Sequence, residues 1–136
     1  MAGITTKGSY GLAAMYELAC HYQQGPLKIH QIADKASIPQ NYLEHILSSL
    51  RKEGLIQSIL GARGGYILAK APSEISVYTV LVTLEGGLCM MNAGPNAVLN
   101  KLWERAANEM QELFKESLQE LVDEGKKLNN QSMYFI

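Results

Sequence analysis

Residues 29–68 combine two short amphipathic segments, a tight turn between them and a glycine-rich hairpin, and this succession constrains the fold most. Ile29, Ile32 and Ala33 occur at i, i+3 and i+4, which predicts a helix of about two turns. After a turn at residues 37–39, QNYLEHILSSLRKEG predicts a longer helix that ends at its glycine. LIQSIL and YILAK flank the glycine turn GARGG and predict a β-hairpin. The pattern indicates a winged helix-turn-helix, with a small α+β domain carrying an incidental hairpin as the alternative.

Helices are also predicted on both sides of this unit. Residues 8–23 have apolar side chains over a broad face, and SVYTVLVTLEG is a compact helix after the wing. From Val98, apolar residues recur in steps of three and four for more than twenty residues, which predicts one long amphipathic helix, too long to fold back onto so small a domain. A second copy is the economical partner for its apolar stripe, and wrapping around its own winged helix is the alternative. The predicted dimer residues are Leu99, Leu102, Trp103, Ala106, Met110, Leu113, Phe114, Leu118 and Leu121.

The fold class is therefore mainly α with a small β-hairpin wing, followed by a long C-terminal dimerisation helix. Residues 1–72 form the winged helix-turn-helix, and residues 73–97 form a linking helix and a sensor loop. Residues 98–136 form the dimerisation helix and tail, so the chain is expected to be a homodimer.

Charge is distributed unevenly along the 136 residues, although the net charge is only −1. Residues 1–70 contain seven Lys/Arg against four Asp/Glu, whereas residues 71–136 contain five against nine. This mild positive excess does not by itself predict nucleic-acid binding. The sequence has no apolar run near the ~18 residues of a membrane span, and its start lacks the pattern of a signal peptide. We therefore expect no membrane association and a cytoplasmic location.

An enzyme is not expected. The histidines at positions 21, 30 and 45 are scattered over predicted helices, without a nucleophile–base pair, paired carboxylates or a phosphate loop. The two cysteines, Cys20 and Cys89, do not make a disulfide framework, and Cys20 falls in the apolar pattern of the first helix.

Several segments together resemble one family. TTKGSYGL, NYLEHILSSLRKEGLI and GARGGYILAK, with LEG at residues 84–86 and Trp103 in the long helix, resemble the winged-helix transcription regulators that include IscR and CymR. The resemblance covers almost the whole chain. It implies a dimeric repressor that binds double-stranded DNA at an inverted-repeat operator. The tail SMYFI is similar to the CymR branch, which implies a metabolic enzyme as a possible protein partner.

The resemblance implies a recognition helix over residues 40–52, whose N-terminal end reaches base edges in a major groove. Asn can pair with adenine and Glu can accept from cytosine, which suits Asn41 and Glu44. For Tyr42 and His45, packing against the core is the alternative. In the wing, Leu60 stands where relatives commonly have Arg. The implied DNA-contacting residues are Thr6, Lys7, Ser9, Tyr10, Lys28, Gln40, Asn41, Tyr42, Glu44, His45, Ser48, Arg51, Lys52 and Arg63, with the last as the substitute wing cation.

The loop after LEG differs from the iron–sulfur branch of this family. In that branch, three cysteines and a nearby histidine bind a 2Fe–2S cluster, and Cys89, Ala93, Ala97 and Asn100 stand at these positions. As written, the loop implies no cofactor; with the cysteines present it implies a 2Fe–2S cluster, with Cys89 as a metal ligand or an ordinary thiol. Two interpretations follow. The chain is a cluster-free form of a repressor of iron–sulfur cluster biogenesis, with alanines only where ligands fall, or it is a CymR-like repressor of cysteine and sulfur metabolism that never binds a cluster and senses through a partner.

Overall fold

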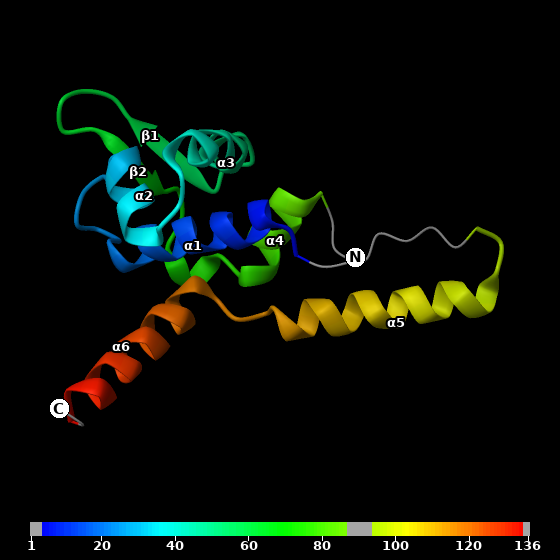
Figure 1. The fold of residues 1–136 in the computed structure, drawn as a ribbon. Helices are drawn as coiled ribbons and strands as arrows, with labels where there is room; N and C mark the ends of the chain where they lie inside the picture. The colour runs from blue at the N-terminus through cyan, green and yellow to red at the C-terminus, as the bar shows by residue number, and fades with distance from the viewer. Residues whose placement is uncertain (1–3, 87–93, 135–136) are drawn as a thin grey trace.

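The predicted helix-turn-helix and hairpin are both present in the computed structural model, which describes residues 4–86 and 94–134 (Figure 1). The first helix begins two residues earlier than predicted and ends three residues earlier. The elements of the winged helix are α1 (Thr6–Cys20), α2 (Ile29–Ala36), α3 (Gln40–Lys52), β1 (Ile56–Ile59) and β2 (Gly65–Leu68).

The helix-turn-helix is fixed by local capping and by one buried stripe. The backbone N–H of Lys28 donates to Gln31 Oε1 at 2.8 Å, which satisfies a donor at the start of α2. Ser37 ends α2 in the left-handed conformation, with φ of 56°. Helix α3 then buries Leu43, Ile46, Leu47 and Leu50, the i, i+3, i+4, i+7 pattern of an amphipathic helix. Its opposite face is left to solvent.

The wing is an antiparallel pair in which Ile56 faces Leu68 and Ile59 faces Gly65. A short bridge between Leu27 and Tyr66 joins the hairpin to the segment before α2. At Gly65 the backbone φ is 151°, and an added Cβ would lie 2.4 Å from the carbonyl oxygen of Leu27. A residue with a side chain is therefore excluded where the hairpin meets this segment.

After the wing, a short 3-10 turn η1 (Pro72–Glu74) leads to α4 (Val77–Glu85), which packs against α1. The approach is close, because a Cβ at Gly8 would lie 2.2 Å from Glu85 Oε1. That carboxylate oxygen accepts two hydrogen bonds of 2.8 Å, from the backbone N–H and the hydroxyl of Thr5. The end of α4 therefore fixes the beginning of α1.

The prediction of one long C-terminal helix is wrong. Two helices, α5 (Ala97–Leu113) and α6 (Leu118–Tyr134), are separated by residues 114–117. This break is paired with the chain around η1 and α4: Tyr78 N–H donates to the carbonyl of Phe114 and Val77 N–H to that of Glu116, both at 2.8 Å. Ser117 Oγ accepts from Glu120 N–H at 3.1 Å and starts the new helix.

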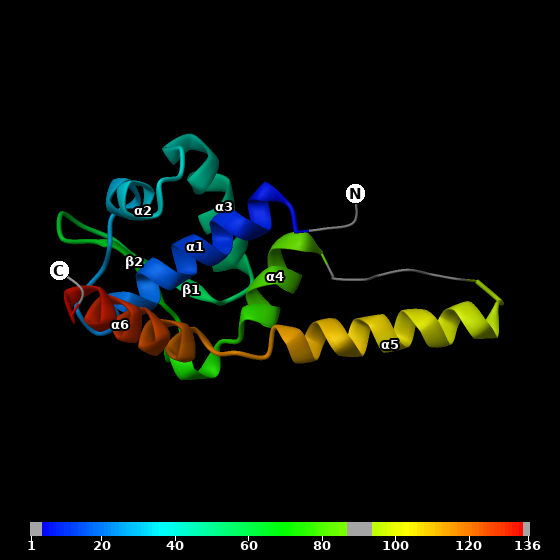
Figure 2. The same cartoon turned by 60° about the horizontal axis from the view of Figure 1, so that its bottom comes forward.

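Helix α6 folds back along α1, in contrast to the sequence expectation (Figure 2). Leu118 is 0% exposed and Val122 is buried in the core, while Leu121 packs against it. Leu118 and Leu121, predicted as dimer residues, therefore pack within their own chain. The alternative, that part of the stripe covers its own winged helix, is confirmed for α6.

Helix α5 extends away from the winged helix, as both ribbon views show (Figures 1 and 2). None of its 17 residues is buried. Within the described ranges, no helix has the length and hydrophobicity to span a bilayer. Within the described residues, six α-helices and a two-stranded hairpin confirm the predicted class, a mainly α winged helix, apart from the division of the C-terminal helix.

Candidate nucleic-acid interface

The outward face of α3 presents a continuous set of polar side chains. Gln40, Asn41, Glu44 and His45 are exposed over its first two turns, because the leucines and isoleucine of the buried stripe point into the core. His45 is exposed, so the packing alternative does not hold for its side chain. Amide, carboxylate and imidazole groups can donate to or accept from base edges, which is the chemistry required of a reading helix.

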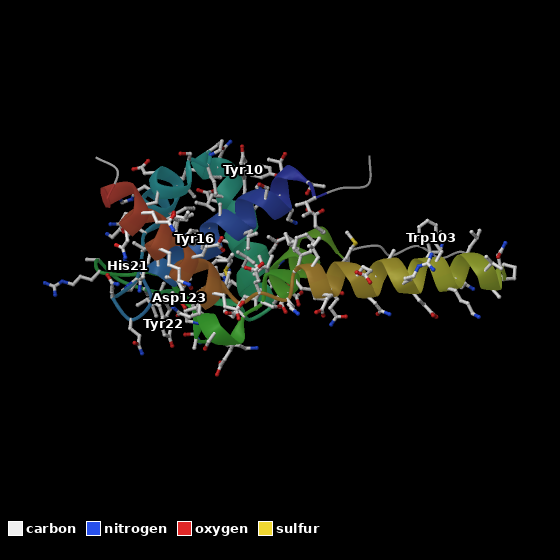
Figure 3. The ribbon with its side chains drawn as sticks, turned by 90° about the horizontal axis from the view of Figure 1, so that it is seen from below. Tyr10, Tyr16, His21, Tyr22, Trp103 and Asp123 are labelled. Carbon is white, nitrogen blue, oxygen red and sulfur yellow. The ribbon has the colours of Figure 1, made fainter. Side chains whose placement is uncertain are left out.

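Tyr42 has a second contact that the sequence did not specify. Its ring lies against that of Tyr10 in an edge-to-face arrangement, with centroids 5.6 Å apart and planes at 83° (Figure 3 labels Tyr10). Tyr42 is 37% exposed and Tyr10 is half-buried. Partial packing of Tyr42 is therefore confirmed, and the pair joins the second turn of α1 to the first turn of α3.

Cations lie at the other end of α3. Arg51 and Lys52 occupy its last turn and are exposed, and Ser48 is half-buried one turn earlier. Among the described residues, the ion pair found is between Lys115 and Glu112, so the two α3 cations are not paired with a carboxylate there. They are accessible to the phosphates of a ligand.

The beginning of α1 provides a third group of polar side chains. Thr6 and Ser9 are exposed and Lys7 is half-buried. The hydrogen bonds between Thr5 and Glu85 hold this segment in place. Sequence reasoning missed this pair, although a Thr preceding a helix and the Glu of LEG were both available as signals.

Lys28, one of the implied DNA contacts, is exposed and also has a partner within the chain. Its ammonium donates to the carbonyl oxygen of Ala62 at 2.8 Å, in the turn of the wing. It therefore joins the start of α2 to the wing. Arg63, the next residue in that turn, is exposed.

The loop that corresponds to the cluster-binding loop of the iron–sulfur branch lies mostly outside the described residues, which include neither Cys89 nor Ala93. Ala97 is the first residue of α5 and is exposed, and its methyl group cannot ligate iron. Asn100, at the position of the histidine, donates through Nδ2 to the carbonyl of Gly94 at 3.0 Å. Within residues 4–86 and 94–134, no group of three His, Cys, Asp or Glu side chains is arranged for a metal. The donor set of this sequence does not fit a 2Fe–2S cluster.

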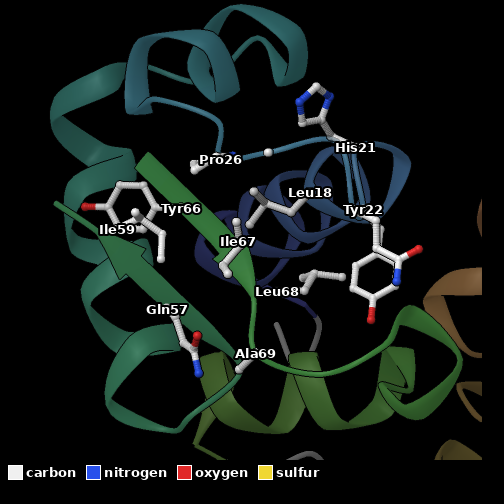
Figure 4. Close-up of a pocket in the computed structure, with 12 residues that line it drawn as sticks. Leu18, His21, Tyr22, Pro26, Gln57, Ile59, Tyr66, Ile67, Leu68 and Ala69 are labelled. Atoms are coloured by element: carbon white, nitrogen blue, oxygen red, sulfur yellow. The ribbon is translucent and has the colours of Figure 1, made fainter. Parts of the chain in front are cut away.

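A hollow of about 580 Å³ separates the end of α1 from the hairpin (Figure 4). Its lining is mainly apolar, with Leu18 and Ile67 among the walls and His21 and Tyr22 at the rim of α1. Cys20, predicted to be core, is exposed nearby. Neighbouring atoms partly desolvate its sulfur, which raises the pKa of the Cys20 thiol because a thiolate there loses hydration. The thiol is therefore protonated at neutral pH.

A polar reading helix, cations at its end and a hairpin fixed beside it define a winged-helix protein of the DNA-binding class. The profile of the Rrf2 family, described as iron-dependent transcriptional regulators, matches residues 4–124. The chain belongs to the Rrf2 family of transcriptional regulators, as the resemblance indicated.

Relatives of two kinds are similar to this chain. CymR of Bacillus subtilis is 35% identical over 113 residues, which are 82% of each protein. IscR of Pectobacterium atrosepticum is 32% identical over 135 residues, 93% of this chain and 82% of IscR. The solved CymR, the global cysteine regulator of B. subtilis, superimposes with a TM-score of 0.80 at 34% identity, covering 90% of this chain and 98% of CymR. T. potens IscR gives 0.80 at 33% identity, with 93% and 90% covered.

Proposed function

We propose that this chain is a dimeric repressor that reads an inverted-repeat operator with α3 and works without an iron–sulfur cluster. The observation that carries the proposal is the outward face of α3, where Asn41, Glu44 and His45 are all exposed beside a fixed wing. A recognition helix of this class contacts base edges through its N-terminal residues. Asn41 pairs with adenine and Glu44 accepts from the amino group of cytosine.

The phosphate contacts come from the periphery of that face. Arg51 and Lys52 neutralise phosphates at the end of α3, and Thr6, Lys7 and Ser9 contact the backbone from the start of α1. Each contact positions the helix without specifying sequence. Each neutralised phosphate steepens the dependence of log K on log salt by about 0.9.

The second part of the proposal is dimerisation through α5, which presents two α3 helices to the two half-sites of the operator. Helix α5 is 17 residues long, about 25 Å, and buries none of its residues within the chain. Leu99, Leu102 and Leu113 leave apolar surface exposed along it. A second copy covers this stripe through a two-fold contact, which pairs the two α3 helices for an inverted repeat.

Two regulons fit the family. The first is iron–sulfur cluster biogenesis, with Ala93 and Ala97 replacing thiolates, and it fits the similarity to IscR over 93% of this chain. The second is cysteine and sulfur metabolism, as in CymR, with a metabolic enzyme bound as the sensing partner. The donor set of the loop favours regulation without a bound cluster in both cases.

Base readout is tested by selecting operators from a randomised duplex library with the wild type and with Glu44→Ala. We expect Glu44→Ala to change the preferred base at one position of each half-site. An unchanged preference would refute the assignment of Glu44. Arg51→Ala should instead weaken all sequences similarly and lower the salt slope by about 1. Lys127→Ala, a matched change at an exposed cation on α6, should leave both quantities unchanged.

The cluster-free state is tested by iron content. We expect the wild type to purify colourless and without iron. Under anaerobic reconstitution, the double variant Ala93→Cys, Ala97→Cys, which keeps Cys89, should gain visible absorption and about two irons per chain. If the double variant binds no iron, the iron–sulfur interpretation fails and the CymR-like repressor remains. Iron in the wild type would contradict the cluster-free proposal itself.

A further inference from the structure

The carboxylate of Glu85, the last residue of α4, holds the first turn of α1 from outside that helix. Its Oε1 accepts from both the backbone N–H and the hydroxyl of Thr5 at 2.8 Å, across 80 residues of sequence. The Thr5 hydroxyl in turn accepts from the N–H of Gly8 at 3.5 Å. A hydroxyl has one hydrogen and two lone pairs, which allows both bonds at once. Thr5 therefore links the carboxylate to the backbone of α1.

The position of Gly8 shows how closely the two helices approach at this point. Gly8 is buried, and an added Cβ would collide with Glu85 Oε1 and lie 3.0 Å from the side chain of Ile4. A side chain here would push the carboxylate away from Thr5. Both ribbon views show the beginning of α1 beside the end of α4 (Figures 1 and 2). The two hydrogen bonds thus form within a close helix contact that restricts the carboxylate to one place.

The segment that Glu85 holds lies beside the reading helix. Tyr10, on the second turn of α1, packs edge to face on Tyr42 in the first turn of α3, with ring centroids 5.6 Å apart. Lys7 is half-buried and precedes Tyr10 by three residues, so the two side chains are neighbours on the surface of α1. The polar start of α1 is therefore anchored at two points, by α3 through Tyr42 and by α4 through Glu85.

We propose that Glu85 is a positioning residue for DNA binding, which fixes Thr5 and thereby holds Lys7 where its ammonium meets a phosphate of each half-site. This inference rests on the proposed reading of DNA by α3. Helix ends fray, and fraying of this turn would carry Lys7 away from the duplex. A turn that is already held loses less conformational entropy on binding, so the phosphate contact gains affinity. Glu85 acts through Lys7 and does not itself touch the duplex.

The charge of Glu85 and its hydrogen bonds affect DNA binding in opposite directions. A carboxylate near the duplex repels phosphates, so removal of its charge alone should leave binding unchanged or strengthen it. Removal of the hydrogen bonds should weaken binding, because the first turn of α1 is released. Glu85→Gln removes only the charge, since its amide oxygen still accepts from Thr5. Glu85→Ala removes the charge and the hydrogen bonds, so the two variants separate position from electrostatics.

The test measures binding to a fluorescein-labelled duplex that carries the operator selected by the wild type, at several salt concentrations. We expect Glu85→Gln to bind at least as tightly as the wild type, with an unchanged salt slope. Glu85→Ala should bind roughly tenfold more weakly per bound chain at about 0.1 M salt and lower the slope by about 1 per chain, the loss of one neutralised phosphate. Glu120→Ala, a matched change at an exposed carboxylate of α6, should behave as the wild type.

A double-mutant cycle with Lys7 shows whether Glu85 acts through that lysine. Lys7→Ala removes the ammonium and leaves the hydrogen bonds between Thr5 and Glu85 in place. If Glu85 positions Lys7, the double variant should bind no more weakly than Lys7→Ala and should have the same salt slope. A structural role alone predicts that the two losses add. Circular dichroism melts of the same samples establish that each variant is folded at the temperature of the binding assay.

The outcomes are distinct. If Glu85→Ala binds as tightly as Glu85→Gln, or if its loss adds fully to that of Lys7→Ala, Glu85 does not position the phosphate contact. Wild-type affinity in Lys7→Ala would likewise overturn the inference, because no contact would remain to be positioned. In each of these cases the wild type still selects an operator and the proposed function stands. If the wild type selects no operator, the proposed function and this inference fail together.

Discussion

Truncation of Leu118 tests whether α6 belongs to the core of its own chain. The Leu118 side chain is 0% exposed, at the point where α6 meets η1 and α1. In a well-studied series, Leu→Ala at buried sites costs about 2.7–5.0 kcal/mol, increasing with the cavity that remains. We expect Leu118→Ala to lower the free energy of unfolding by about 3–4 kcal/mol. A chain of this size loses about 3 °C of melting temperature per kcal/mol, so the transition should fall by about 10 °C.

The assay is thermal unfolding followed by circular dichroism, at one protein concentration so that dimerisation contributes equally. Leu60→Ala removes the same atoms from a side chain that is 93% exposed, and it should change the melting temperature by less than about 2 °C. If Leu118→Ala has the same melting temperature as Leu60→Ala, then Leu118 is not part of the core and α6 does not pack on α1 of its own chain.

Three further perturbations test other parts of the account. Leu113→Glu should shift the protein from dimer to monomer in sedimentation without unfolding it, because Leu113 is 67% exposed within its own chain. The control Gln111→Glu should remain dimeric. A dimeric Leu113→Glu would exclude this end of α5 from the dimer interface. A Gly→Ala change ordinarily stabilises a helix by about 1 kcal/mol, but in Gly8→Ala the new Cβ displaces the Glu85 carboxylate, so urea unfolding should show a net loss of stability; a net gain would exclude a stabilising role for the hydrogen bonds between Thr5 and Glu85. At pH 8, Cys20 should be alkylated more slowly in folded than in urea-unfolded protein, because partial desolvation of its sulfur raises the pKa and leaves less thiolate; equal rates by peptide mass spectrometry would contradict this desolvation.

The winged helix could be predicted because its signals are local. Ile29, Ile32 and Ala33 define one face of α2, the four buried side chains of α3 follow the 3.6-residue period, and GARGG specifies the turn between two strands. These features do not depend on contacts distant in sequence. The outward face of α3 follows from the same periodicity, which is why its exposed polar residues were available from the sequence.

The break between α5 and α6 could not be predicted in this way. The apolar spacing continues from Met110 through Phe114 to Leu118, so periodicity gives no sign of an interruption. The interruption is stabilised by backbone hydrogen bonds to residues 75–78, including Leu118 N–H to the carbonyl of Ile75 at 2.9 Å. Pairing over about forty residues of sequence overrides the local helical preference.

The features of the candidate site likewise divide into those set by local sequence and those set by tertiary packing. Exposure of Asn41 and Glu44 followed from the sequence, whereas the hydrogen bonds of Lys28 to Ala62 and of Thr5 to Glu85 depend on tertiary packing. The hydrogen bond by which Lys28 holds the wing was consequently not available from the sequence.

The central claim, a two-fold DNA reader built on α3, is tested most directly by operator selection with the wild-type protein, followed by counting chains on the selected duplex. We predict an inverted repeat whose half-sites are separated by about 34–36 Å, one helical turn, or by a multiple of that distance, with two chains bound per repeat. Asn41→Ala should bind the selected duplex no better than a scrambled one. Enrichment of no sequence, or a single chain bound to an asymmetric site, would contradict the account.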